Sequence, residues 1–384
     1  MGGMGDRIAP PRATPSLPTG KVPARYTDMR EASYQFLKQL LETPSPSGFE
    51  TKGQRVWMDY VSQFADEVYS DTYGNCFAVL NPKGTPRVLM SGHSDEIGFM
   101  VQYINDDGFI YFQSIGGSDP AIARGQRVIV HGKDGPVPGV IGQLAVHMQE
   151  ADDRKKVPDF HQMFIDIGAT SKADALAKVR VGNAITYNYG VVELGNGRIA
   201  ARGCDNRIGT FAAAEGLRRA SEQRDKLQAC VIAVSTIQEE NGLYGATMAG
   251  YSVHPDVALV VDVTHATDIP LCTKNKHGDV RLGGGPVISW GSSNHPVVNA
   301  RLEELAARQN MKVQFESNPR HTGTDADTIF RQKGGIPTVS LGLPNRYMHS
   351  PVEVIELEDL NELGTLMASF ALDLKADEKF AVKI

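Results

Sequence analysis

An apolar segment of the chain, residues 231–237, is followed almost at once by two adjacent carboxylates, Glu239 and Glu240. Its length and its β-branched residues predict a buried strand, so that the two glutamates stand at the carboxyl end of that strand. Because side chains on an extended segment alternate between faces, one glutamate can bind a metal while the other faces a substrate water. The pair therefore indicates chemistry at the edge of a sheet.

Histidines and carboxylates occur in matching contexts elsewhere in the chain. In an open α/β sheet, the loops at the carboxyl ends of the strands form the ligand crevice, so groups far apart in the sequence can converge there. Two histidines with three carboxylates suit two divalent metal ions, with water in the remaining positions. Five segments supply such groups: His93 with Asp95, Asp205, Glu239 with Glu240, Asp262 and His349.

Each of these residues also has an ordinary structural explanation. Asp205 precedes the apolar stripe of a predicted helix, where an N-cap is expected. Asp262 could cap a turn, and the two histidines could be hydrogen-bonded loop residues. The glutamate pair could belong to a solvated loop. The metal site is the better interpretation, because otherwise all five segments would have to be coincidences.

The composition and the hydrophobic periodicity of the sequence change along the chain. Residues 1–25 are rich in proline and glycine and have no apolar stretch, which predicts a mobile tail and not a secretory signal. Residues 29–102 and 203–376 predict an α/β domain with a mixed sheet flanked by helices. Residues 103–202 consist of short β-type runs between glycine-rich turns, which predicts an inserted small β-barrel. Both ends of that barrel must return to the active-site sheet.

The composition narrows the classes of partner. The formal net charge is -6 and there is no basic run, so nucleic acid is not an expected partner. No apolar stretch approaches the roughly 18 residues that span a bilayer, so membrane insertion is not expected. The four cysteines form no CxxC pattern, which predicts reduced thiols and a cytoplasmic protein.

Six segments resemble, in order, the motifs of one enzyme family. They are HSDEIGFMV, CDNRIGTFAAAEGL, QEENGLYGA, VVDVTHATDIP, TGTDAD and YMHSPVEVIEL. The family is that of the tetrahedral, TET-type metallo-aminopeptidases, which includes glutamyl and leucyl aminopeptidases and proteins labelled as endoglucanases. The resemblance covers residues 30–375 and implies a metallo-exopeptidase fold with an inserted barrel.

The resemblance also implies which residues bind metal. His93, Asp205 and Asp262 are expected to hold one divalent ion. Asp205, Glu240 and His349 are expected to hold the second, so that Asp205 bridges the two. Zinc is the first expectation for both ions, with cobalt or manganese as alternatives.

Further expectations follow from the same resemblance. Glu239 corresponds to the general base, and Asp95 to the carboxylate that orients His93. A cis peptide bond is expected after Asp205. The substrates would be short peptides, and the chain would form a homododecamer, built from dimers, through its barrel.

Two other functions remain open at the level of sequence. A glycosidase could place Glu239 and a second carboxylate on either side of a sugar bond, although the two histidines argue against it. A binding or scaffold protein could keep the fold without turnover, although every essential position is filled.

Overall fold

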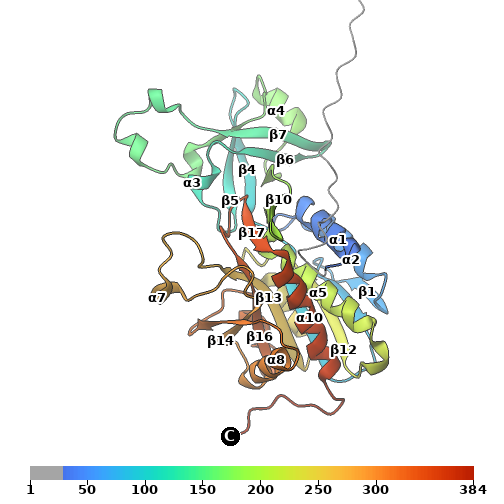
Figure 1. Ribbon diagram of the computed structural model, residues 1–384. Coiled ribbons are helices and arrows are strands. Elements are labelled where there is room, and N and C mark those ends of the chain that lie inside the picture. Colours follow the sequence, from blue (N-terminus) through green and yellow to red (C-terminus); the bar gives the residue numbers. More distant parts are fainter. Residues whose placement is uncertain (1–28) are drawn as a thin grey trace, which may run out of the picture.

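A mixed sheet of eight strands forms the centre of the larger part of the computed structural model, which describes residues 29–384 (Figure 1). The tail predicted for residues 1–25 lies outside the described residues. Four neighbouring strands, β12, β3, β13 and β16, run parallel, so their carboxyl ends meet at one edge. In spatial order the strands are β1 (Glu67–Ser70), β2 (Cys76–Leu80), β12 (Cys230–Thr236), β3 (Arg87–His93), β13 (Val257–His265), β16 (Thr338–Asn345), β14 (Val287–Gly291) and β15 (Gln314–Asn318).

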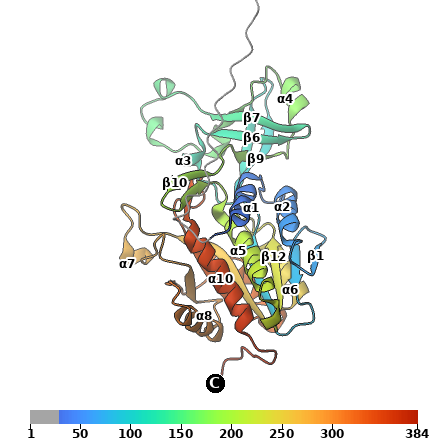
Figure 2. The same cartoon turned by 45° about the vertical axis from the view of Figure 1, so that its right-hand side comes forward.

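Helices cover both faces of this sheet, because its strands carry apolar side chains on both sides. On β12, Val231 and Ala233 pack into the larger core, whereas Ile232 and Val234 pack into the smaller one. Figure 2 shows α5 and α10 lying across the larger face. The helices of the larger face are α1 (Glu31–Glu42), α2 (Thr51–Val61), α5 (Cys204–Ser221), α8 (Pro296–Arg308) and α10 (Leu357–Asp373), and those of the smaller face are α6 (Tyr244–Val253) and α9 (Ala326–Ile329). The expected α/β class is confirmed.

A closed barrel of six strands stands at one end of this α/β part (Figure 1). It has its own core, in which Phe99 packs edge-on against Phe112 and Tyr187. The chain enters the barrel directly after β3 and leaves it before α5. Its strands are, in spatial order, β4 (Gly98–Ile104), β5 (Ile110–Ile115), β8 (Phe164–Asp166), β7 (Gly135–Gly142), β6 (Arg127–Gly132) and β9 (Ala184–Tyr187). The short helices α3 (Pro120–Ala123) and α4 (Lys172–Lys178) lie between these strands in the sequence.

A three-stranded sheet connects the exit of the barrel to the C-terminal part of the chain. It consists of β10 (Val192–Gly195), β11 (Arg198–Ala201) and β17 (Glu353–Glu356), and β11 pairs antiparallel with β17. This pairing brings the residues just before α5 beside those that follow β16. One further short helix, α7 (Lys274–His277), lies after β13. Within residues 29–384, no helix combines the length and the apolar character needed to cross a membrane.

Helix α5 rests directly on strand β3. A Cβ atom at Gly92 would lie 2.2 Å from the carbonyl carbon of Gly209, so the two backbones touch where neither residue has a side chain. Any larger residue at Gly92 would push the helix away from the sheet. This contact brings the first residues of α5 to the carboxyl end of β3.

Candidate active site

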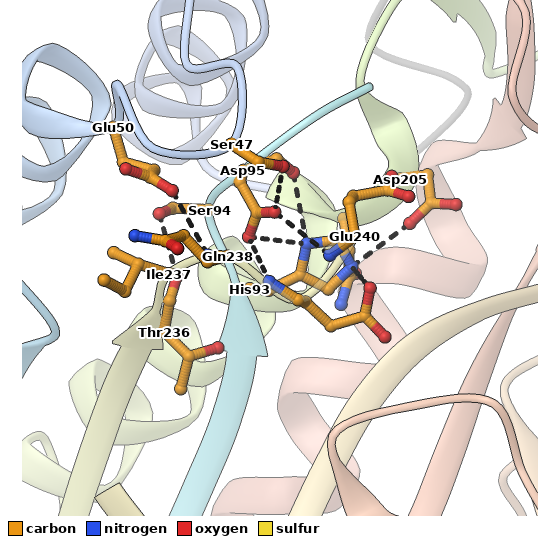
Figure 3. A network of polar contacts seen from close by, with 12 residues as sticks. Ser47, Glu50, His93, Ser94, Asp95, Asp205, Thr236, Ile237, Gln238 and Glu240 are labelled. Atoms are coloured by element: carbon orange, nitrogen blue, oxygen red, sulfur yellow. Dashed lines mark hydrogen bonds and ion pairs between the residues drawn. The ribbon is translucent and has the colours of Figure 1, made fainter. Parts of the chain in front are cut away.

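The structure brings all seven residues singled out in the sequence to the carboxyl edge of the central sheet. Figure 3 shows four of them, His93, Asp95, Asp205 and Glu240, turned toward one another. The seven are His93 at the end of β3, Asp95 just beyond it, Asp205 at the start of α5, Glu239 and Glu240 after β12, Asp262 in β13, and His349 after β16.

Two groups of possible metal ligands share one residue. His93, Asp205 and Asp262 form the first group, and their ligand atoms all lie within 4.8 Å of one another. Asp205, Glu240 and His349 form the second by the same measure. Oδ1 of Asp205 lies 3.3 Å from Nε2 of His93, and Oδ2 lies 3.2 Å from Nε2 of His349. The two oxygens of Asp205 therefore face different groups.

Asp205 does not serve as a helix cap. The N-cap of α5 is Gly203, and Asp205 and Asn206 both depart from helical backbone angles. The peptide bond between these two residues is cis, which confirms the expectation from the sequence. The Asn206 side chain donates to the carbonyl of Val261 at 2.8 Å and accepts from the N–H of Gly209 at 3.0 Å. These bonds hold the start of α5 against β13 and leave the carboxylate of Asp205 for the site.

Asp95 connects His93 to the glutamate pair (Figure 3). Its Oδ1 atom lies 3.3 Å from Nδ1 of His93 and accepts the backbone N–H of Glu239 at 3.0 Å. Its Oδ2 atom accepts the hydroxyl of Ser47 at 2.6 Å and the backbone N–H of Glu240 at 3.2 Å. Nδ1 of His93 meets only acceptors here, so it carries a proton, and Nε2, which faces the carboxylates, is the atom that would bind a metal ion.

The glutamate pair does not lie on a strand. β12 ends at Thr236, and Gln238 has a φ of 53°, so the backbone turns before it reaches Glu239. Side chains replace the sheet partners there: Asn75 and Glu50 accept the backbone N–H groups of residues 237 and 238, each at 3.1 Å. The expectation that strand alternation separates the two glutamates is wrong, because they belong to a loop bound by long-range hydrogen bonds.

The carboxylates of the site crowd one another. Burial and nearby carboxylates raise the pKa of Glu239 to about 10, and raise the pKa values of Glu240 and Asp262 well above their usual range. Oε1 of Glu240 is buried without a hydrogen-bond partner among residues 29–384. Buried carboxylates at this density remain ionised only beside positive charge. A donor set of imidazoles and carboxylates fits divalent metal ions, so the residues present fit the group that the family resemblance implies.

The same crowding of carboxylates also raises the pKa values of the two histidines. Burial lowers the pKa of His93, but the charges of Glu239 and Asp95 and the hydrogen bonds to Asp205 and Asp95 outweigh it and raise that pKa well above its usual value. The hydrogen bond to Asp205 likewise raises the pKa of His349. Both imidazoles thus lie in a strongly negative environment, which attracts cations of any kind.

One residue that supports the site was not singled out in the sequence. Glu353, at the start of β17, is buried, and its Oε2 accepts the backbone N–H of Asp205 at 3.1 Å. Its Oε1 accepts the backbone N–H of His349 at 2.9 Å. Glu353 thus holds the backbones of two residues of the second group. The available signal was a glutamate next to apolar residues in the segment VEVIE, four positions after His349.

The site opens into a cavity of about 610 Å³. Its walls come from the loop after β12, the ends of β13 and β16, strand β15 and the loop that follows it. Asp205, Glu239, Glu240, Asp262 and His349 all line it, so a small molecule in this space would touch both ligand groups.

Comparison with known proteins identifies a single family. The sequence model of the M42 glutamyl aminopeptidase family matches residues 74–366. The lysyl aminopeptidase of Pyrococcus furiosus is 32% identical over 348 residues, which cover 89% of this chain and 97% of that protein.

Two solved structures are similar over almost their whole length. A TET aminopeptidase from a marine sediment archaeon of the Thaumarchaeota has 33% identity and a TM-score of 0.86, covering 90% of this chain and 97% of its own. The TET1 peptidase of Pyrococcus horikoshii, which can assemble into a tetrahedron or a large octahedral shell, has 30% identity and a TM-score of 0.79, covering 89% and 100%. These matches confirm the family expected from the six motifs: the chain belongs to the peptidase M42 family, the M42 glutamyl aminopeptidases.

Proposed function

We propose that this chain removes the N-terminal residue from short peptides, using a water activated between two divalent metal ions. The observation that carries the proposal is the pair of ligand groups that share Asp205, with Glu239 beside them in the lining of the same cavity. Membership of the M42 family supports the reaction class.

In this proposal each ion has three protein ligands. His93, Asp205 and Asp262 hold the first, and Asp205, Glu240 and His349 hold the second. Asp205 would contribute to both, because its two oxygens face different ligand groups. Zinc suits this donor set, and cobalt or manganese would also be accepted. Such a pair, when bound, polarises a scissile carbonyl and lowers the pKa of a bound water.

Glu239 is the proposed general base. It belongs to neither ligand group, yet its Oε2 atom lies 3.6 Å from Nε2 of His93, so it borders the space where a water would lie. Positive charge in the two groups favours the ionised carboxylate and lowers its pKa from the high value caused by burial. Glu239 then takes a proton from the water and returns it to the leaving amine.

Asp95 is proposed to position both partners of this reaction. Its carboxylate orients the ring of His93 and holds the backbone of Glu239, so the ligand and the base share one anchor. A shared anchor keeps the distance between metal and base constant, which general-base catalysis requires.

The protein is proposed to work as a cytoplasmic homo-oligomer. The TET1 peptidase of P. horikoshii can assemble into a tetrahedron or a large octahedral shell, and the similarity covers 89% of this chain and 100% of that one. A dodecamer built from dimers is the assembly we infer, with the barrel as its interface. Cys76, Cys204, Cys230 and Cys272 are all unpaired, which supports a reducing compartment.

Hydrolysis of leucine p-nitroanilide, with and without metal, tests the proposed function. The protein dialysed against EDTA should lose its activity and regain it on addition of zinc, cobalt or manganese. The N-acetylated substrate should resist hydrolysis, because it has no free terminal amine. Full activity after chelation, or equal hydrolysis of the acetylated compound, would contradict the proposal; release of nitrophenol from a nitrophenyl glycoside by the chelated protein would favour the glycosidase.

A further inference from the structure

The cavity beside the proposed metal site carries one carboxylate that the proposed mechanism does not use. Glu316, on strand β15, lines the cavity together with the proposed catalytic residues. Among the described residues that line this space there is no lysine and no arginine. The cavity therefore has a second negatively charged position, at Glu316, outside the two ligand groups.

Glu316 is held in place by neutral groups alone. Its Oε1 atom accepts the hydroxyl of Ser289 at 2.5 Å and the side-chain amide of Asn318 at 3.3 Å. Its Oε2 atom accepts the hydroxyl of Thr264. Within the described chain it forms no ion pair. Three neutral donors fix the direction of the carboxylate but do not cancel its charge, so the side chain is preorganised for a cation that the protein itself does not supply.

Glu316 lies too far from the proposed metal site for a short substrate side chain to reach it. Asp262 and Thr264 lie two residues apart on β13 and point to the same face, about 7 Å from one another. Glu316 contacts Thr264 and so lies one side chain further from the proposed metals. A substrate whose scissile carbonyl is at Asp262 needs a long side chain to reach it.

Small residues form the floor of the cavity between Asp262 and Glu316. Gly342 on β16 pairs with Asp262, and it lines the cavity with Ser340 from the same strand. A Cβ atom at Gly342 would lie 2.8 Å from Cγ2 of Thr264. The missing side chain thus lets Thr264 lean across β16 toward Glu316, and small residues form the floor between the reacting end and the carboxylate.

We propose, building on the aminopeptidase function above, that this cavity selects peptides whose N-terminal residue is lysine or arginine. The ammonium or guanidinium group binds Glu316, and the aliphatic stem crosses the floor that Ser340, Gly342 and Thr264 line. Lysine carries its charge on a flexible four-carbon stem, and arginine presents donors that match a carboxylate in pairs. An N-terminal glutamate is rejected because its carboxylate would face that of Glu316 without a cation between them. A leucine or norleucine side chain fills the same space but leaves Glu316 desolvated and unpaired.

Lysine and norleucine p-nitroanilides provide the sharpest test, because their side chains share the same four-carbon stem and only lysine adds an ammonium group. The metal-loaded wild-type protein should show a higher kcat/KM for lysine than for norleucine, by about 10- to 100-fold, and the lowest value for glutamate. In Glu316→Gln, which keeps the size of the side chain, the ratio of lysine to norleucine should fall toward one. The ratio, and not a single rate, is the readout, so a general loss of activity does not imitate the effect.

Glu304→Gln is the matched control. Glu304 lies on α8, its side chain is 58% exposed, and it does not line the cavity, so the same change of charge there should leave the ratio unaltered. Inhibition of the wild-type protein by free L-lysine and L-norleucine gives a second measure that needs no substitution. Lysine should bind more tightly, and its advantage should shrink with added salt.

The outcomes separate this inference from the function on which it rests. If the metal-loaded protein hydrolyses none of the three p-nitroanilides or leucine p-nitroanilide, the aminopeptidase function itself fails. If it hydrolyses them but prefers norleucine or glutamate, the inference is overturned and the function stands. The inference is also overturned if Glu316→Gln keeps the wild-type ratio, or if lysine and norleucine inhibit equally.

Discussion

The carbonyl oxygen of Gly117 lies 3.1 Å from Nδ1 of His349, and this contact links the barrel to the catalytic edge of the sheet. A carbonyl can only accept, so Nδ1 carries a proton and Nε2 is the atom that would bind a metal ion. That Nε2 atom lies 3.2 Å from Asp205 and 3.5 Å from Glu240. Gly117 follows β5, so the inserted barrel sets the orientation of a proposed ligand in the other part of the molecule.

Gly117→Ala should therefore weaken one metal and spare the other. The new Cβ atom would lie 2.9 Å from Nδ1 of His349 and would displace its ring. We expect the affinity of the second site to fall about 10- to 100-fold, as is typical when a partner of a metal-binding histidine is lost. Metal content after dialysis, measured by elemental analysis, should drop from two ions per chain toward one.

Gly190→Ala is the control for that substitution, because its Cβ atom would meet nothing closer than 3.7 Å. It should keep both ions. Retention of two tightly bound ions in Gly117→Ala would show that the barrel loop does not position His349.

Glu239→Gln and Glu240→Gln should separate the base from the ligand. Glu239→Gln should keep both metals while kcat falls by roughly 100- to 10,000-fold, the usual cost of losing a general base. Glu240→Gln should instead lose one metal, because an amide oxygen is a poorer ligand than a carboxylate, and excess metal should restore part of the rate. Kinetics beside elemental analysis decide between them, and the opposite pattern would exchange the two roles.

Asp95→Asn should impair ligand and base together. Each carboxylate oxygen of Asp95 accepts one backbone N–H group of the glutamate pair. An asparagine replaces one of these oxygens with an NH₂ group, which donates and cannot accept, so one of the two hydrogen bonds is lost. We expect a loss of about 10- to 100-fold in metal affinity or in kcat, measured by metal titration and by steady-state kinetics. Asp107→Asn, at an exposed turn of the barrel, should change neither. A normal metal affinity and kcat in Asp95→Asn would remove it from the site.

Light scattering should give a molar mass twelve times that of one chain. The barrel has its own core and stands at one end of the molecule, which leaves its outer surface available for contacts between chains (Figure 1). A fully active monomer, or an isolated dimer, at micromolar concentration would contradict the proposed dodecamer. Dimers that appear only after chelation would instead link assembly to metal binding.

The stability of the barrel should fall on mild acidification because of His131 on β6. Burial, with a smaller effect of Lys52, lowers the pKa of His131 to about 4, and its Nε2 atom lies 2.9 Å from the hydroxyl of Thr186. A depressed histidine pKa means that the unfolded chain binds the proton more tightly. Stability is therefore complete above the unfolded pKa of about 6.5 and is lost as the pH falls toward 4, by about 1 to 3 kcal/mol.

His131→Gln, which stays neutral throughout, should flatten this dependence. Thermal unfolding of the wild-type protein and of His131→Gln at pH 7 and at pH 5 measures this dependence. The difference in Tm between the two proteins should be smaller at pH 5 than at pH 7. Loss of metal at low pH affects both proteins alike. Parallel profiles would show that His131 does not titrate in this range.

The sequence by itself was sufficient to predict which residues meet in the site. Apolar runs that end near His93, Glu239 and Asp262 become neighbouring parallel strands, and parallel strands present their carboxyl ends at one edge. Local periodicity encodes strand and helix, so the α/β class and the inserted barrel were also predictable from the pattern. The family motifs supplied the expected roles of the individual residues, which the substitutions above test.

Only the tertiary structure decided how those residues are held and what the cavity contains. Glu353 accepts the backbone N–H groups of Asp205 and His349. The carbonyl of Gly117, in the loop after β5, contacts the imidazole of His349. Glu316 on β15 accepts the hydroxyl of Thr264 on β13. Each is a contact between segments distant in the chain, made by loops and strand ends whose paths depend on packing. Hydrophobic periodicity records which face of an element is buried, but it does not record which side chain meets another across a cavity.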